Sequence, residues 1–220
     1  MAIPSVSGSQ QYVTDDAALT EYRACLIQLW HGERSSWALP ACTPLHDLEV
    51  SAGLVAVWKD EGDGHPEYVA QLKSILFRNK GGRFGVGLVV GTGRDPGLSD
   101  VRAPGWNVYT YLPATVSFFS ERLLVHNNIG YLYDHRTGHE NDHQSLTVAV
   151  RTDVSLRKYF VVVGEIYDSS DSEAEFQIGA RAWTRPGKVQ IDLSYGGLLT
   201  RWERAAGWTL GLALATPPIL

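Results

Sequence analysis

The sequence lacks the long apolar run that a membrane-spanning helix requires. No stretch approaches the ~18 consecutive apolar residues of such a helix, so a helical membrane protein is excluded. A transmembrane β-barrel is not excluded, because each of its strands needs only ~9–11 residues of alternating hydrophobicity. The formal net charge of −5 also lacks the basic excess of nucleic-acid-binding domains, so we expect no nucleic-acid partner.

A targeting signal is missing from the start of the chain as well. The first residues, Met-Ala-Ile-Pro-Ser, have neither the basic region nor the apolar core of a signal peptide. If the protein is exported, we expect its signal peptide to have been removed ahead of this sequence.

Cysteine occurs only twice, at Cys25 and Cys42. The segment between them is predicted to form a hairpin with its tip near Glu33 and Arg34, which brings the two cysteines opposite each other. A cross-strand disulfide is then geometrically possible, and it would fit an oxidising periplasm or cell surface. The alternative is a pair of buried thiols in a cytosolic protein.

The chain does contain segments in which apolar and polar residues alternate, most clearly between Ala174 and Thr216. Three runs there place apolar residues at every second position, which is the period of a β-strand. The apolar positions are Phe176, Ile178, Ala180 and Ala182, then Val189, Ile191, Leu193 and Tyr195, then Trp208, Leu210, Leu212 and Leu214. In a soluble β-sandwich, these apolar faces would pack against each other in the core. The opposite faces, however, are rich in small residues with few charges, which favours the lumen of a barrel.

The same alternation predicts about twelve strands along the whole chain, with 10–12 as the range. Tight turns follow every second strand and longer loops mostly fall between them, as in outer-membrane barrels. Aromatic residues gather at both sets of strand ends, as expected of two interfacial girdles. We therefore predict an all-β, transmembrane, antiparallel up-and-down β-barrel over residues 21–220 with both termini periplasmic. Residues 1–20 are predicted to form an N-terminal periplasmic segment or a plug. A soluble lipocalin-like barrel is the rival fold, and it would need fewer strands and an apolar cavity.

One predicted strand, residues 84–93, carries glycine at Gly85, Gly87, Gly91 and Gly93. The spacing does not match a nucleotide-binding loop, and no helix follows it. We interpret these glycines as a strand face against which something packs closely.

Several segments resemble a known family. They are Val13-Thr14-Asp15-Asp16, Trp37-Ala38-Leu39-Pro40-Ala41-Cys42, the block from Gln177 to Gly196, and Gly211-Leu212-Ala213-Leu214. They resemble small Gram-negative outer-membrane β-barrel proteins related to transporters of the phenol-degradation-pathway type. The resemblance implies an outer-membrane location and passage of small molecules, and it carries no agreed catalytic residues. The chain departs from many such barrels in ending on Pro217-Pro218-Ile219-Leu220 instead of an aromatic residue.

The polar faces of the predicted strands hold the main candidate site. Its residues carry both signs of charge: Glu49, Gln71, Lys73, Arg151, Asp153, Glu165, Gln177, Arg181, Gln190 and Asp192. They could form a selective lining for a small polar solute or ion. Alternatively, they could pair with one another, fill a narrow barrel and block it.

Two other kinds of chemistry need consideration. His135, His139 and His143 lie with several carboxylates in one loop and are candidate ligands for Zn²⁺ or Cu²⁺, although a solvated loop explains them as well. His126 with Asn127 and Asn128 offers a base for a lipase-like hydrolase, but no Gly-x-Ser-x-Gly elbow is present. We therefore expect no enzymatic activity and no cofactor.

The sequence as a whole predicts a monomeric porin-like channel in the lipid bilayer of a bacterial outer membrane. Its role would be passive passage of a small solute. The alternatives are a plugged barrel with a structural or surface-interaction role and, less favoured by the motifs, an outer-membrane hydrolase.

Overall fold

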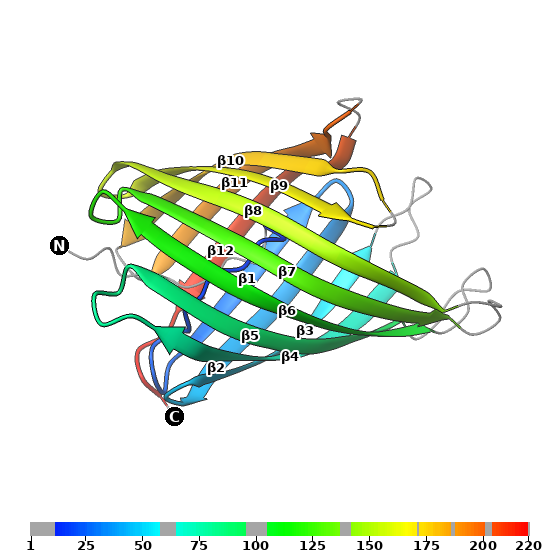
Figure 1. The fold of residues 1–220 in the computed structure, drawn as a ribbon, viewed down its shortest axis with the longest axis horizontal. Helices are drawn as coiled ribbons and strands as arrows, with labels where there is room; N and C mark the ends of the chain where they lie inside the picture. Colours follow the sequence, from blue (N-terminus) through cyan, green and yellow to red (C-terminus); the bar gives the residue numbers. More distant parts are fainter. Residues whose placement is uncertain are drawn as a thin grey trace.

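The fold is seen in a computed structural model that describes residues 12–57, 65–95, 105–136, 142–170, 172–185, 188–200 and 204–219. These residues form twelve antiparallel strands and no helix (Figure 1). The strands are β1 (Cys25–Gly32), β2 (Ser35–Leu45), β3 (Leu48–Val57), β4 (His65–Arg78), β5 (Phe84–Asp95), β6 (Gly105–Phe118), β7 (Leu123–Arg136), β8 (His143–Arg157), β9 (Phe160–Ser169), β10 (Glu175–Arg185), β11 (Val189–Leu198) and β12 (Arg204–Ala215).

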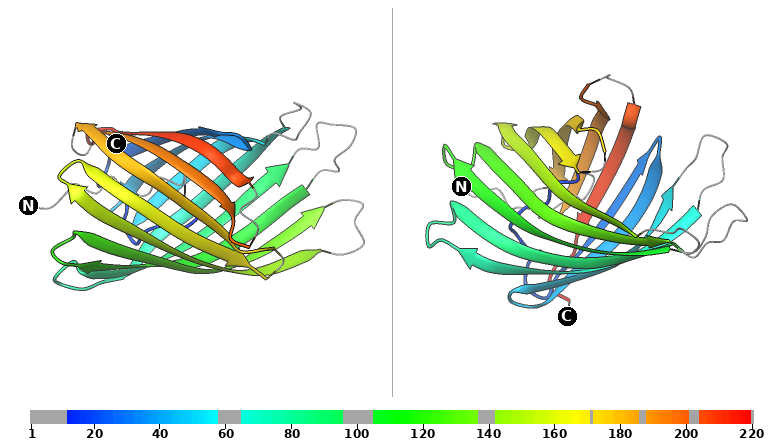
Figure 2. Two further views of the ribbon diagram at one scale, coloured as in Figure 1. Left: turned by 90° about the horizontal axis from the view of Figure 1, so that it is seen from above. Right: turned by 45° about the vertical axis from the view of Figure 1, so that its right-hand side comes forward.

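Each strand pairs with its neighbours in sequence, and β1 pairs with β12 to close a barrel. Figure 2 shows the strands strongly tilted as they wind around the barrel. Closure leaves no unpaired strand edge. The predicted up-and-down barrel of about twelve strands is therefore confirmed.

The barrel has two different ends. Short connections join β2 to β3, β4 to β5, β6 to β7, β8 to β9 and β10 to β11 at one of them, which we call the tight-turn end. Most of the longer connections lie at the other, which we call the loop end. β1 begins and β12 ends at the tight-turn end (Figure 1).

Several strands are longer than the alternation predicted. β7, for example, continues to Arg136 and β8 begins at His143, so both reach beyond their alternating apolar residues. Backbone pairing continues past the point where the apolar face ends, because the ladder requires only N–H and C=O groups. Hydrophobic periodicity therefore marks the apolar belt of a strand and not its full length.

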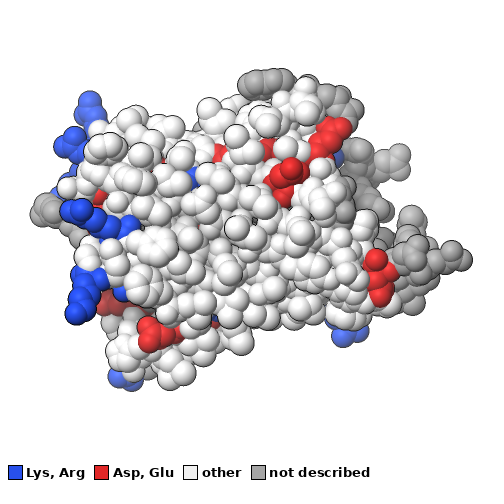
Figure 3. All heavy atoms as spheres, viewed as in Figure 1, with Lys and Arg blue, Asp and Glu red and all other residues white. Residues whose placement is uncertain are grey.

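The two faces of the sheet differ in polarity. Outward positions carry large apolar side chains that are exposed, such as Leu146, Ile178, Leu193 and Leu210. Figure 3 shows a middle zone almost free of charged residues, with lysine and arginine gathered towards the tight-turn end. A surface this apolar needs a cover other than water, as the outer wall of a membrane barrel has.

The hairpin of β1 and β2 forms as predicted. Cys25 is directly opposite Cys42 in the register, and the two sulfur atoms form a disulfide. Pro40 lies within β2, where the pairing with β3 passes from Ala38–Leu54 to Ala41–Ser51 without a pair between them. A proline has no N–H to donate, so the ladder is interrupted at this residue.

None of the described residues forms a helix long and apolar enough to cross a membrane.

Candidate functional site: the interior of the barrel

The ten candidate residues all point into the barrel and are buried. Their strands are spread around the wall: β3 holds Glu49, β4 holds Gln71 and Lys73, β8 holds Arg151 and Asp153, β9 holds Glu165, β10 holds Gln177 and Arg181, and β11 holds Gln190 and Asp192. The alternation of side chains along a strand explains this arrangement, because inward and outward residues occupy alternate positions. On β4 the alternation holds up to the register shift between Ile75 and Phe77.

Four of these charges form a continuous network along one wall. Asp153 accepts a hydrogen bond from Arg151 Nε at 2.9 Å and another from Arg181 at 3.3 Å. Arg181 Nε also donates to Asp192 at 2.7 Å, and Gln190 donates to the second oxygen of that carboxylate at 2.6 Å. Each of these four buried charges is thus paired with an opposite charge, which offsets the cost of burying it away from water.

The N-terminal segment Tyr12–Thr20 passes through the interior and contacts this wall. Glu165 accepts hydrogen bonds from the backbone N–H groups of Val13 and Thr14, at 3.0 and 2.5 Å. Arg151 donates to the carbonyl oxygen of Thr14 at 2.5 Å. The ring of Tyr12 lies 5.8 Å from the guanidinium carbons of both Arg151 and Arg181, within reach of a cation–π interaction.

The same segment is bound to the opposite wall. Lys73 Nζ on β4 lies 2.9 Å from Asp15 and 3.3 Å from Asp16. Further along the segment, Thr20 N–H donates to Glu49 at 2.8 Å, and Ala17 N–H donates to Thr115 at 2.8 Å. Side chains from both walls therefore satisfy the backbone of a segment that has no regular secondary structure of its own.

A cavity lies on each side of the segment. The cavity at the tight-turn end has a volume of about 320 Å³ and is lined by residues that include Asp16, Ala17, Phe84 and His126. The cavity at the loop end has a volume of about 340 Å³. Tyr12, Val13 and Asp15 belong to its lining, so the segment separates the two spaces.

Aromatic side chains line the loop-end cavity. Trp30 on β1 stacks on Trp37 on β2 with ring centroids 5.2 Å apart, and Tyr109 stacks on Tyr111 within β6 at 6.3 Å. Gly91 on β5 permits this arrangement, since a Cβ atom there would lie 2.2 Å from the Tyr109 ring. The expectation that something packs closely on the glycine face of this strand is confirmed.

His126, the candidate base of a hydrolase, is buried beside Thr115 and Asp153. Its Nδ1 lies 2.9 Å from the Thr115 hydroxyl, but its Nε2 is 3.7 Å from Asp153, beyond hydrogen-bond distance. Asp153 is held by two arginines, and the Thr115 oxygen already accepts the N–H of Ala17. The orienting bond that an activated nucleophile needs is therefore not made.

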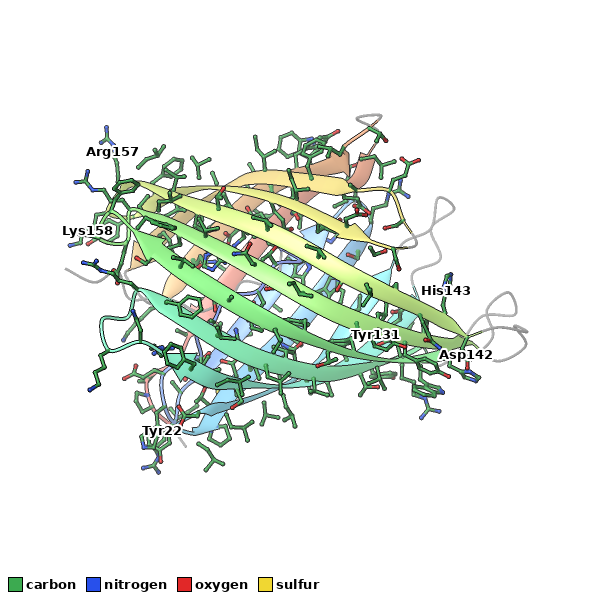
Figure 4. All side chains as sticks on the ribbon, viewed as in Figure 1. Tyr22, Tyr131, Asp142, His143, Arg157 and Lys158 are labelled. Carbon is green, nitrogen blue, oxygen red and sulfur yellow. A yellow bond between two sulfur atoms is a disulfide. The ribbon has the colours of Figure 1, made fainter. Side chains whose placement is uncertain are left out.

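The candidate metal ligands lie at the loop end, where Figure 4 labels His143 and Asp142. His139 falls outside the described residues. His135 Nδ1 lies 2.6 Å from Asp142, and Tyr133 also donates to that carboxylate. These hydrogen bonds hold the pKa of Asp142 below its usual value. Within the described ranges, no group of three or more histidine, cysteine or carboxylate side chains is arranged to hold a metal ion.

Sequence reasoning did not assign a site role to Tyr12, Thr14, Asp15 or Asp16, which contact most of the polar wall. The sequence did single out part of this segment, because Val13-Thr14-Asp15-Asp16 was one of the stretches that carried the family resemblance. Irregular segments have no periodicity, so their contact partners were not predictable.

Comparison with known proteins agrees with the fold. A model of the family described as "Uncharacterised conserved protein UCP029691" matches residues 4–216. No curated protein matches the sequence. Among solved structures, a KdgM porin in complex with disordered oligogalacturonate has a TM-score of 0.61 at 8% identity, over 88% of this chain and 98% of that one.

Two further structures are similar. An outer membrane channel from Pseudomonas putida F1 has a TM-score of 0.57 at 10% identity, over 87% of this chain and 93% of that one. A NanC porin has a TM-score of 0.54 at 8% identity, over 87% and 97% of the two chains. At such low identity these structures establish a shared fold.

Proposed function

Because the chain belongs to the family described as "Uncharacterised conserved protein UCP029691" and shares its fold with solved porins, we propose that it is a channel of the bacterial outer membrane. A small solute would pass through it passively. The apolar outer wall and the polar interior support this proposal, since a membrane barrel needs one face for lipid and the other for solute. The disulfide is consistent with an oxidising compartment.

The observation that carries the proposal is the pair of cavities inside the barrel. A single short segment, Tyr12–Thr20, lies between them. If this segment leaves its position, the two cavities join into one passage between the ends of the barrel. Residues 1–20 would then act as a plug, and residues 21–220 would form the pore.

The orientation and the oligomeric state are part of the same proposal. The tight-turn end, where β1 begins and β12 ends, would face the periplasm, as the short turns of outer-membrane barrels do. One chain would suffice for a pore, because every strand edge is paired within it. The fold shared with solved porins and an outer membrane channel supports a small molecule as the cargo.

A permanently blocked barrel is the second candidate, and the buried contacts of the segment favour it. Asp15 and Lys73 form a buried ion pair, and Glu165 accepts hydrogen bonds from two backbone N–H groups. If these contacts never break, the barrel conducts nothing and would serve a structural or surface-interaction role.

Single-channel recording in a planar bilayer tests the proposal. Refolded protein should produce discrete steps of current. Insertion is verified separately, by protection of the barrel from protease in the same lipid. Silence from inserted protein would overturn the channel and leave the blocked barrel.

A further inference from the structure

The loop-end cavity has the composition of a ligand site. Its volume of about 340 Å³ is within the range of small-molecule pockets. The stacked pairs Trp30–Trp37 and Tyr109–Tyr111 contribute four aromatic rings, and Tyr12 adds a fifth from the N-terminal segment. These five inward rings gather around one small space, whereas the other inward positions of these strands hold mainly small or polar residues.

Two of these rings are held in place by hydrogen bonds. The Tyr109 hydroxyl donates to Gln71 at 3.0 Å, and the Tyr111 hydroxyl donates to Asp15 at 3.2 Å. Gly91 leaves the room that the Tyr109 ring occupies. Side chains fixed in this way lose little conformational freedom when a ligand binds.

The charged side chains in the described lining of the cavity are all negative. Its described lining includes two carboxylates, Asp15 and Glu67, and no lysine, arginine or histidine. Lys73 lies next to it and pairs with Asp15, but Asp16 and Glu49 are buried near the same lysine. Arg151 and Arg181 lie 5.8 Å from the Tyr12 ring, but they are paired with Asp153 and Asp192. The local balance therefore remains negative, and an anion would be repelled.

We propose that the loop-end cavity binds a small organic cation, such as a quaternary ammonium compound, between its aromatic rings. The faces of aromatic rings carry negative potential and attract cations, and aromatic cages are a known means of recognising quaternary ammonium groups. The carboxylates add a Coulombic attraction at close range. This assignment rests on the proposed channel function only in naming the bound molecule as a solute that enters from the loop end.

Three molecules that share a bulky trimethyl head group test the charge preference. Choline carries a positive charge on this group, dimethylbutanol is its neutral isostere with carbon in place of nitrogen, and dimethylbutyrate joins the same neutral head group to an anionic carboxylate. We would titrate each by calorimetry into the full chain in a maltoside detergent, since phosphocholine detergents would compete. Choline should bind about tenfold more tightly than dimethylbutanol, and dimethylbutyrate should not bind. Equal binding of choline and dimethylbutanol, or no binding of choline, would overturn the proposal.

Variants locate the site. Trp37→Leu and Tyr109→Leu should each weaken choline binding about tenfold. The control is Trp208→Leu, because Trp208 is exposed on the outer wall and its loss should leave binding unchanged. Equal effects of all three would show that choline does not occupy this cavity. If a cavity variant fails to fold, the three-molecule titration of the unaltered chain still decides.

This binding experiment requires no current. Absence of choline binding together with discrete current steps would reject the cation site and retain the channel. Choline binding to a barrel that is silent in the bilayer would retain the site and reject passive transport.

Discussion

Lys73 on β4 and Asp15 of the N-terminal segment form an ion pair of 2.9 Å in which each side chain is 3% exposed. This pair joins the wall of the barrel to the segment that separates its two cavities. The stability of the closed arrangement therefore depends on a contact between residues that are 58 positions apart. On the opposite side, Arg151 and Glu165 hold the backbone of the same segment.

We expect Lys73→Met to release the segment. The variant removes the cation that pairs with Asp15 and Asp16, and removing one partner of a buried pair costs about 3–5 kcal/mol. That penalty falls on the seated segment alone, because Asp15 and Asp16 return to water when the segment leaves. In a planar bilayer, the fraction of time spent in conducting states should rise at least tenfold.

Lys80→Met, in the exposed turn between β4 and β5, is the control and should behave as the unaltered protein. Identical recordings from both variants would mean that the Lys73 pair does not hold the segment.

The open pore should prefer cations. Once the segment has left with Asp15 and Asp16, four buried carboxylates of the described wall outnumber three buried cations: Glu49, Asp153, Glu165 and Asp192 against Lys73, Arg151 and Arg181. The reversal potential in a potassium chloride gradient should therefore show potassium as the more permeant ion. Glu49→Gln should reduce this preference, whereas Asp168→Asn, at an exposed position of the loop end, should not. A preference for chloride would contradict the charge balance.

The disulfide should stabilise the barrel at its closing hairpin. Cys25 and Cys42 are separated by 17 positions, and cross-linking a loop of about 15 residues is worth about 3 kcal/mol in the chain-entropy treatment. The double variant Cys25→Ala/Cys42→Ala should lose about that much free energy of unfolding in urea. Reducing agent should lower the stability of the unaltered protein and leave the double variant unchanged. Equal stability of the oxidised protein and the double variant would show that the disulfide contributes nothing.

The sequence was sufficient for the strands because their signal is local. Alternation at Ile191 and Leu193 determines which side chains face outward, and a shift of one residue would reverse every position. The inward orientation of Gln190 and Asp192 follows from the same alternation. The residues that face the interior were therefore predicted together with the apolar residues that face outward. Cys25 and Cys42 were also predictable, because a hairpin tip near Glu33 sets their register.

The arrangement inside the barrel was not predictable in the same way. Asp153 was assigned to the polar face, but nothing in the sequence indicated that Arg151 and Arg181 would share its two oxygens. The ion pair of Lys73 with Asp15 likewise joins an irregular segment to a distant strand. Such contacts depend on the shape of the closed interior, which exists only after all twelve strands have paired.

The apolar outer wall provides the most direct test that the barrel lies in lipid. Leu193 is 49% exposed near the middle of β11, and an arginine at the bilayer midplane costs about 2–4 kcal/mol, falling to about 0–1 kcal/mol near the interfaces. Leu193→Arg should therefore make the free energy of folding into lipid vesicles less favourable by about 2–4 kcal/mol. The matched control is Leu199→Arg, since Leu199 is similarly exposed but follows the end of β11. This control should cost less than about 1 kcal/mol, because its arginine can reach the headgroups. Two equal losses would mean that depth in the bilayer does not govern the penalty. Two negligible losses would mean that the face carrying Leu193 does not contact lipid.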